Sequence, residues 1–118
     1  MEPHDLASAL ARLPALTDPA FTQLDPFDHG GIFVGRFSGQ TPWERHPRGD
    51  ELVHVLDGEV ELTVLTENAP VHVTLRGGSV FVVPQGLWHR QHARASVTML
   101  TATPTPTDTS MADDPRSA

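Results

Sequence analysis

The side chains best suited to metal chemistry lie close together near the middle of the chain. Glu44, His46 and Glu51 fall within eight consecutive positions, and carboxylate oxygens and imidazole nitrogens are both ligands for divalent ions. Because alternate residues of a strand share one face, Glu44 and His46 point in the same direction if this stretch is extended. The types and spacing of these residues therefore predict a metal site.

A further histidine, His89, lies well downstream and follows a turn-prone Pro-Gln-Gly segment at 84–86. Proline fixes φ and glycine permits a sharp change of direction, so this turn can aim the histidine. The turn residues 47–50 separate His46 from Glu51, and a strand pair closed by them would bring these two side chains together. The candidate metal ligands are therefore His46, Glu51, His89 and Glu44.

This ligand set suits a divalent first-row ion such as Mn, Fe, Ni, Co or Zn, and including Glu44 favours the harder ions Mn and Fe. Glu44 could instead pair with an arginine and leave a barrel without metal. A carboxylate that does not bind the ion could accept a proton, but no catalytic residue is assigned. Gln91 shares strand parity with His89 and is a candidate pocket residue, whereas His54 and His92 have the opposite parity to the ligands beside them.

The elements that must position these residues are short strands. From residue 31 the chain alternates apolar runs with turns, and the predicted strands are 31–37, 42–46, 51–57, 59–66, 70–76, 80–83, 88–93 and 96–102. Strands without intervening helices imply an antiparallel sandwich or barrel. The wholly apolar run 80–83 should be covered on both faces, which predicts packing against a second subunit and hence a homodimer.

The two ends of the chain have other patterns. Leucines at helical spacing predict a short helix over 4–13, and the Pro- and Asp-rich residues that follow predict an irregular lead-in as far as residue 29. The Thr- and Pro-rich end lacks apolar periodicity and predicts a flexible tail. The expected organisation is a helix and lead-in at 1–30, a β-barrel at 31–102 and a disordered tail at 103–118.

Two motifs resemble those of the cupin superfamily, and the resemblance covers about residues 31–102. The first reads Glu44, His46, Glu51 and Gly58, and the second reads Gly78, Pro84, Gly86 and His89. Every spacing inside the two motifs matches the family pattern. Glu44 stands where the family usually has a histidine, Ala93 stands where an asparagine often follows, and the glycine expected before the first motif is displaced to Gly39.

The resemblance implies a small single-domain cupin: an all-β, antiparallel jelly-roll barrel that holds a divalent metal ion and a small-molecule ligand or substrate. Related cupins include dioxygenases, isomerases, epimerases and lyases, and the fold does not select one of them. The alternative is a non-catalytic cupin that binds or senses a small ligand. Small cupins commonly pair through a sheet face, which agrees with the expected homodimer.

Composition limits the remaining possibilities. The chain has 118 residues, 38% of them hydrophobic, and a net charge of −7, which fits one compact domain. An acidic chain without a basic cluster is a poor partner for nucleic acid or an anionic membrane surface. Cysteine, lysine and tyrosine are absent, so thiolate, Schiff-base and phenolic chemistry are excluded. No long apolar run opens the chain, so the expected location is cytoplasmic.

Overall fold

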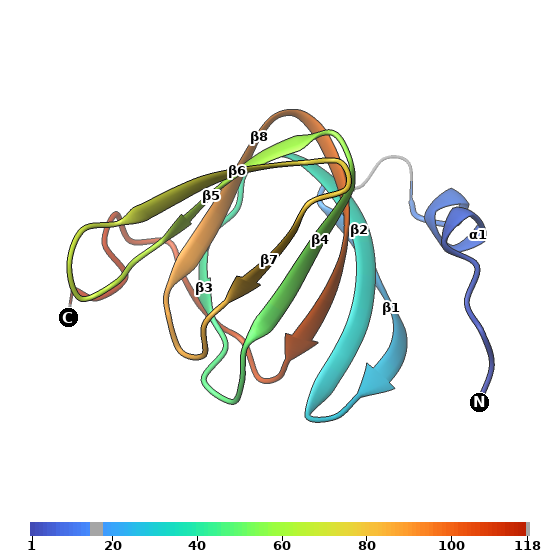
Figure 1. The fold of residues 1–118 in the computed structure, drawn as a ribbon, viewed down its shortest axis with the longest axis horizontal. Coiled ribbons are helices and arrows are strands. Elements are labelled where there is room, and N and C mark those ends of the chain that lie inside the picture. Colours follow the sequence, from blue (N-terminus) through green and yellow to red (C-terminus); the bar gives the residue numbers. More distant parts are fainter. Residues whose placement is uncertain (15–17, 118) are drawn as a thin grey trace.

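The computed structural model describes residues 1–14 and 18–117, and its strands form one curled antiparallel sheet (Figure 1). The elements in chain order are α1 (Leu6–Ala11), β1 (Ala20–Phe27), β2 (Gly30–Gln40), β3 (Trp43–Arg45), β4 (Glu51–Asp57), β5 (Glu59–Val64), β6 (Val71–Arg76), β7 (Val80–Val83), β8 (His89–Pro104) and β9 (Asp108–Ser110). The predicted all-β, antiparallel jelly-roll architecture is confirmed.

Strand β8 connects the two halves of the sheet. Its first residues pair with β5 and with Glu44 of β3, and its later residues pair with β2 on one side and β4 on the other. The sequence predicted two strands here, at 88–93 and 96–102, but the chain continues as one strand of 16 residues. The interruption becomes a register shift opposite Gly39 of β2, so the strand changes partners without ending.

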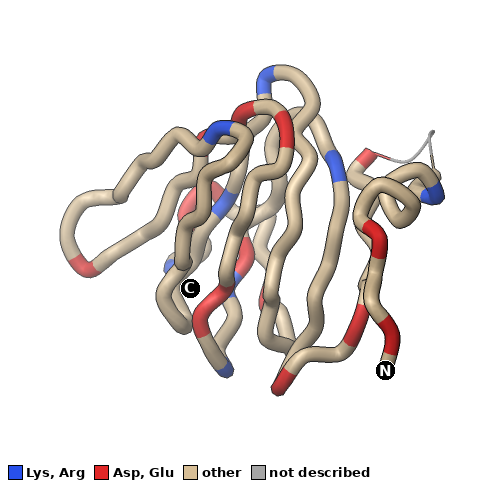
Figure 2. The backbone as a smooth tube through the Cα atoms, turned by 45° about the vertical axis from the view of Figure 1, so that its right-hand side comes forward, with Lys and Arg blue, Asp and Glu red and all other residues tan. Residues whose placement is uncertain are grey.

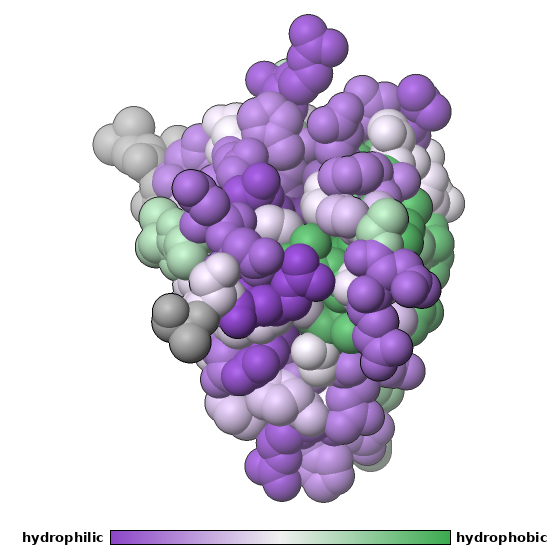
Figure 3. Space-filling model, turned by 90° about the vertical axis from the view of Figure 1, so that its left-hand side faces the viewer, coloured by the Kyte–Doolittle hydropathy of each residue, from purple (hydrophilic) through white to green (hydrophobic). Residues whose placement is uncertain are grey.

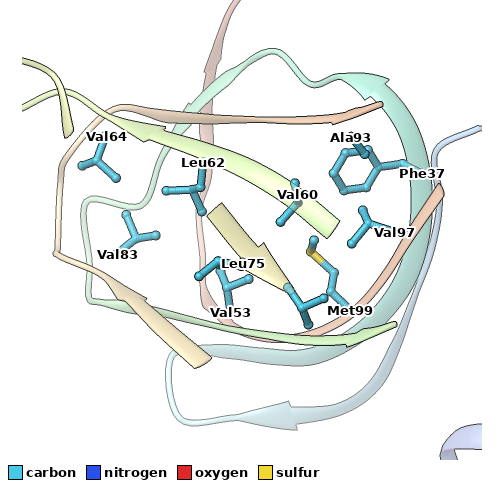
Figure 4. Packing of buried hydrophobic residues seen from close by; sticks show 11 residues of the cluster. Phe37, Val53, Val60, Leu62, Val64, Leu75, Val83, Ala93, Val97 and Met99 are labelled. Carbon is cyan, nitrogen blue, oxygen red and sulfur yellow. The ribbon is translucent and has the colours of Figure 1, made fainter. Parts of the chain in front are cut away.

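The interior of the curled sheet is filled by side chains that alternate along each strand. In β4 the buried positions are Glu51, Val53 and Val55, as the period of two predicts. Strand β5 alternates in the same way. The core cluster, drawn as sticks in Figure 4, contains Phe37, Val53, Val55, Val60, Leu62, Val64, Leu75, Val83, Ala93, Val97 and Met99. These apolar contacts hold the strands that carry the site.

The N-terminal part differs in detail from its prediction. Helix α1 is shorter than the predicted 4–13 and begins after Asp5, whose carboxylate accepts a hydrogen bond from the Ser8 N–H at 2.9 Å. Helix α1 contacts β2, and Ala9 is buried there. The predicted irregular lead-in contains β1, which pairs with β2 along its length. Residues 15–17 of that lead-in lie outside the described residues.

The C-terminal part corrects the expectation of a flexible tail from residue 103. Strand β8 extends to Pro104, and residues 108–110 form β9, which adds to the free edge of β3. The prediction failed because this segment is ordered by its partners and not by its own composition. Strand β3 offers unpaired backbone groups with which β9 pairs, and Arg45 forms a 2.8 Å ion pair with Asp108. Low apolar content therefore did not prevent this segment from ordering.

The outer face of β7 departs from the expected burial. Val80 and Val82 are 56% and 49% exposed, so within the described residues this apolar run is covered on its inner side only. Hydrophobic residues also gather between hydrophilic ones on the face drawn in Figure 3. The arginines, by contrast, are scattered along the backbone (Figure 2).

Candidate metal centre

Three of the predicted ligands converge inside the barrel. The ligand atoms of His46, Glu51 and His89 all lie within 4.8 Å of one another, and all three residues are buried. Glu51 lies between the imidazoles, with its carboxylate oxygens 3.4 Å from Nε2 of His46 and 3.2 Å from Nε2 of His89. Two imidazoles and one carboxylate thus face a common point.

Two turns fix this convergence and are bonded to each other. The Gly86 N–H donates to the carbonyl oxygen of His46 at 3.0 Å. Gln85 donates its backbone N–H to the Asp50 carboxylate at 2.7 Å and its side-chain amide to the Pro47 carbonyl at 2.9 Å. Gly86 has φ of +76°, a conformation that other residues rarely adopt. The turn before His89 is therefore locked to the turn between His46 and Glu51.

The orientation of each imidazole is set by the nitrogen that faces away from the site. Nδ1 of His89 lies 3.0 Å from the carbonyl oxygen of Leu87, which can only accept, so Nδ1 carries the hydrogen. Nδ1 of His46 lies 3.0 Å from the Thr107 hydroxyl. In neutral His89, Nε2 then presents a lone pair to the site, and neutral His46 does so when its Nδ1 donates to Thr107. Such outer hydrogen bonds are typical of metal-binding histidines.

The inward-facing atoms do not satisfy one another. Nε2 of His46 is buried and has no hydrogen-bond partner among the described residues. With Nδ1–H of His89 directed outward, its neutral ring turns a lone pair toward the anionic Glu51 carboxylate, and lone pairs repel one another at such distances. The neutral ring of His46 does the same when its Nδ1 donates to Thr107. A proton or a metal ion at the common point removes this conflict, so the residues present fit a divalent cation.

Glu51 is held by a short chain of hydroxyls. Thr103 donates to its Oε2 at 2.7 Å, and the hydroxyls of Thr101 and Thr103 lie 2.8 Å apart. Because the Thr103 hydrogen is directed at Glu51, Thr101 must donate to Thr103. Both hydroxyl hydrogens are thus committed, and the carboxylate is fixed in the orientation that faces the histidines.

The pKa values follow from burial and from the mutual contacts. Burial alone would raise the pKa of Glu51, but the imidazoles of His46 and His89 outweigh it and lower that pKa from 4.5 to about 2. Burial would lower the pKa of His89, yet its contact with the Glu51 carboxylate raises it. The pair therefore favours the charged forms, as an acid and a base in contact should.

Glu44 occupies a separate position beside this group. Its Cα pairs with that of His89 across β3 and β8, and Glu44 lines the same cavity as Glu51. It is outside the group whose ligand atoms lie within 4.8 Å of one another. Burial and the nearby Glu51 carboxylate raise the pKa of Glu44. Among the described residues no arginine forms a salt bridge with it, which disfavours the alternative of a structural ion pair.

The other candidates divide as strand parity predicts. Gln91 lines the same cavity as His89, and its Oε1 is buried without a hydrogen-bond partner in the described chain. His54 and His92 are outside the ligand group. Each of the two tryptophans lies under an arginine: Arg90 is 4.4 Å from the Trp43 ring, and Arg45 is 4.7 Å from the Trp88 ring.

Sequence reasoning missed the threonines that support the ligands. Thr103 and Thr107 lie in the segment predicted to be a flexible tail, and no motif marks them. Their only sequence signal is position: they follow the last apolar alternation of the barrel, where a strand that continues by a few residues would pass the site. Residue spacing within a Thr-Pro repeat could not show which hydroxyls turn inward.

A cavity of about 250 Å³ adjoins the ligands. One part of its wall is apolar and the remainder carries oxygen-bearing side chains. Its lining consists of Phe21, Phe33, Met99, Thr101, Thr103, Thr107, Gln91, Glu44, Glu51 and His89. The volume is enough for a small organic molecule beside an ion.

Comparison with known proteins finds relatives by sequence and by structure. "Germin-like protein 1" of Brassica napus is 35% identical over 104 residues, which cover 78% of this chain and 50% of that protein. A cupin superfamily protein of Desulfitobacterium hafniense DCB-2 superposes with a TM-score of 0.70 at 22% identity. The superposed region covers 89% of this chain and 92% of that protein. The hydroquinone 1,2-dioxygenase PnpCD, in complex with Cd²⁺ and 4-hydroxybenzonitrile, superposes with a TM-score of 0.57 at 24% identity. The superposed region covers 64% of this chain and 58% of that chain.

The chain spans between 24% and 50% of the length of the first curated relatives that it matches. Within the described residues, no helix has the length and apolar content needed to cross a membrane. The family model described as "Cupin domain" matches residues 37–102. That match includes all the candidate ligands and more than half of the 118 residues, and the chain therefore belongs to the cupin family.

Proposed function

We propose that this chain is a metal-binding cupin in which His46, Glu51 and His89 hold a divalent ion. The observation that carries this proposal is the pair of Nε2 atoms turned toward the Glu51 carboxylate, with Nε2 of His46 left without a hydrogen-bond partner in the described chain. A buried polar atom in this condition is costly unless something binds it. Glu44 is the fourth ligand or, when it does not bind the ion, a proton acceptor beside it.

The proposed activity is that of a metal-dependent enzyme acting on a small molecule, of the dioxygenase, isomerase or lyase type. A bound ion would supply Lewis-acid chemistry or a docking point for a substrate oxygen. The residues of the chain itself would orient the substrate in the cavity and move a proton at the Glu44 carboxylate. Similarity of fold to a hydroquinone dioxygenase that binds Cd²⁺ supports the dioxygenase type.

Metal analysis is the direct test. Freshly purified protein, and metal-free protein titrated with Mn(II), Fe(II), Ni(II) or Zn(II), should bind one ion per chain. His89→Ala should lose binding by at least tenfold, because it removes one of three ligands. His54→Ala removes a histidine from the outer side of β4 and should bind like wild type. A wild type that takes up none of these ions would refute the proposal.

A second candidate is a non-catalytic module that binds or senses a small ligand. It is favoured by the cavity lining, in which the polar groups other than the ligands and Glu44 are three threonines and one glutamine. A binder would show a ligand-dependent rise in melting temperature without product. An enzyme would form product and lose turnover on chelation and in His46→Ala.

We further propose a homodimer formed through the outer face of β7. Val80 and Val82 are exposed there, and the neighbouring Leu52 of β4 is only partly covered. An isologous pairing would bury the same apolar residues twice. Sedimentation at micromolar concentration should show a dimer that dissociates in the Val80→Ser/Val82→Ser double variant. A wild-type protein that is monomeric would refute the proposed dimer.

The expected cytoplasmic location is a separate prediction, which cell fractionation would test.

A further inference from the structure

We infer that the cavity beside the ligands selects a neutral molecule of about one aromatic ring that donates a hydrogen bond, and disfavours carboxylates. This inference rests on the proposed function, because it takes the ion to be bound by His46, Glu51 and His89. It goes further by assigning the chemical class of the ligand from the charge, polarity and size of the cavity wall.

The charge of the wall is the first argument. Two carboxylates, Glu44 and Glu51, line the cavity, and its described lining contains no arginine or other cationic residue apart from His89. A divalent ion is neutralised by two carboxylates, so little positive charge remains to attract an anion. The arginines nearest in sequence are engaged elsewhere: Arg45 with Asp108 and Trp88, and Arg90 with Trp43.

The hydrogen-bonding polarity of the wall is the second argument. The hydroxyl hydrogens of Thr101 and Thr103 are already committed toward Glu51. Gln91 lines this cavity and a neighbouring one, and its buried Oε1 has no donor among the described residues. A buried acceptor without a donor is unfavourable. The oxygens of Glu44, Glu51 and Gln91 therefore outnumber the donors of this wall, which are the Thr107 hydroxyl and the Gln91 amide nitrogen. A ligand that donates, through a hydroxyl or an amide, satisfies these oxygens, whereas a carboxylate adds further acceptors.

The apolar part of the wall sets the shape. Phe21, Phe33 and Met99 also line the cavity, and such side chains favour the face or edge of a ring. Phe21 is 43% exposed, so it lies at the rim, where a ligand can enter. Since an apolar cavity of about 150 Å³ holds benzene, a cavity of about 250 Å³ accommodates one ring with a polar substituent.

The experiment compares probes that differ in charge but hardly in size. Protein loaded with Mn(II), with its metal content measured first, is titrated calorimetrically with phenol, benzamide and benzoate at constant ionic strength. Phenol and benzamide should bind at least tenfold more tightly than benzoate. Oxalate, a small dianion without an apolar part, should bind more weakly than phenol.

Two variants assign the selectivity to Glu44. Glu44→Gln removes one negative charge with little change of shape and should strengthen benzoate binding about tenfold, while phenol binding changes less than threefold. Glu59→Gln removes a surface carboxylate that pairs with Arg76 and should change neither. Benzoate or oxalate that binds the manganese-loaded wild type as tightly as phenol would overturn the inference and leave the metal site intact. Failure to load manganese would instead contradict the proposed function.

Discussion

Replacing Thr107 by valine tests how the C-terminal segment supports the metal site. Thr107 Oγ1 lies 3.0 Å from Nδ1 of His46 and is the partner that the structure gives this nitrogen. Valine has nearly the shape of threonine but cannot bond the ring. In Thr107→Val the buried imidazole therefore keeps its packing and loses what fixes its tautomer and rotation.

The size of the effect follows from the burial of the ring. His46 is 3% exposed, so water cannot readily replace the lost partner, and an unsatisfied buried polar group costs about 1–3 kcal/mol. Loss of an outer hydrogen bond to a ligating histidine typically weakens metal affinity about 10- to 100-fold. We expect Thr107→Val to bind Mn(II) or Zn(II) at least tenfold more weakly than wild type.

Competition with a chelator of known affinity, on protein first stripped of metal, measures this difference. Thr105→Val is the matched control, because the Thr105 hydroxyl donates to the His29 carbonyl at 3.0 Å and is not among the residues lining the cavity. It should reduce stability slightly and leave metal affinity unchanged. Equal affinity of Thr107→Val and wild type would show that packing alone orients His46. Equal losses in both variants would point to general loosening of the segment.

The remaining predictions concern pH and backbone conformation. The folded-state pKa of Glu51 lies below its unfolded value. The ionised carboxylate therefore contributes up to about 3 kcal/mol to stability above pH 4.5, and this contribution is lost as the pH falls toward 2. In urea unfolding, the stability of metal-free Glu51→Gln should not show this fall between pH 4.5 and 2. The raised pKa of His89 means that protons compete with the metal, so Zn(II) affinity should be weaker at pH 6 than at pH 8, and an unchanged affinity would contradict this. Gly58→Ala should destabilise more than Gly39→Ala in thermal unfolding: both glycines have positive φ, but only at Gly58 would a Cβ lie 2.4 Å from the Ser96 carbonyl oxygen. The Gly39 variant should lose about 1 kcal/mol, and equal losses would show that φ alone sets the cost.

Sequence patterns were most informative where one physical rule dominates. The period of two accounts for the burial of Glu51 together with Val53 and Val55 in β4. The turn residues before His89 predicted its aim, because proline and glycine restrict the backbone locally. Convergence of His46, Glu51 and His89 followed from these local rules together with the resemblance to a known motif pair.

The same reasoning failed where order depends on a distant partner. Strand β1 exists because β2 offers it an edge, and β9 exists because β3 does. Neither segment has a strong period of its own. For the same reason the support of His46 by Thr107 could not be foreseen, since 61 positions separate the two residues and no local pattern links them.

The bonds between the two turns of the site have a consequence for redesign. Gln85 and Gly86 are anchored to Asp50, Pro47 and His46, so neither loop can be lengthened or grafted without misplacing a side chain borne by the other. Transplanting a new specificity onto this scaffold requires exchanging both loops together, as a single cassette.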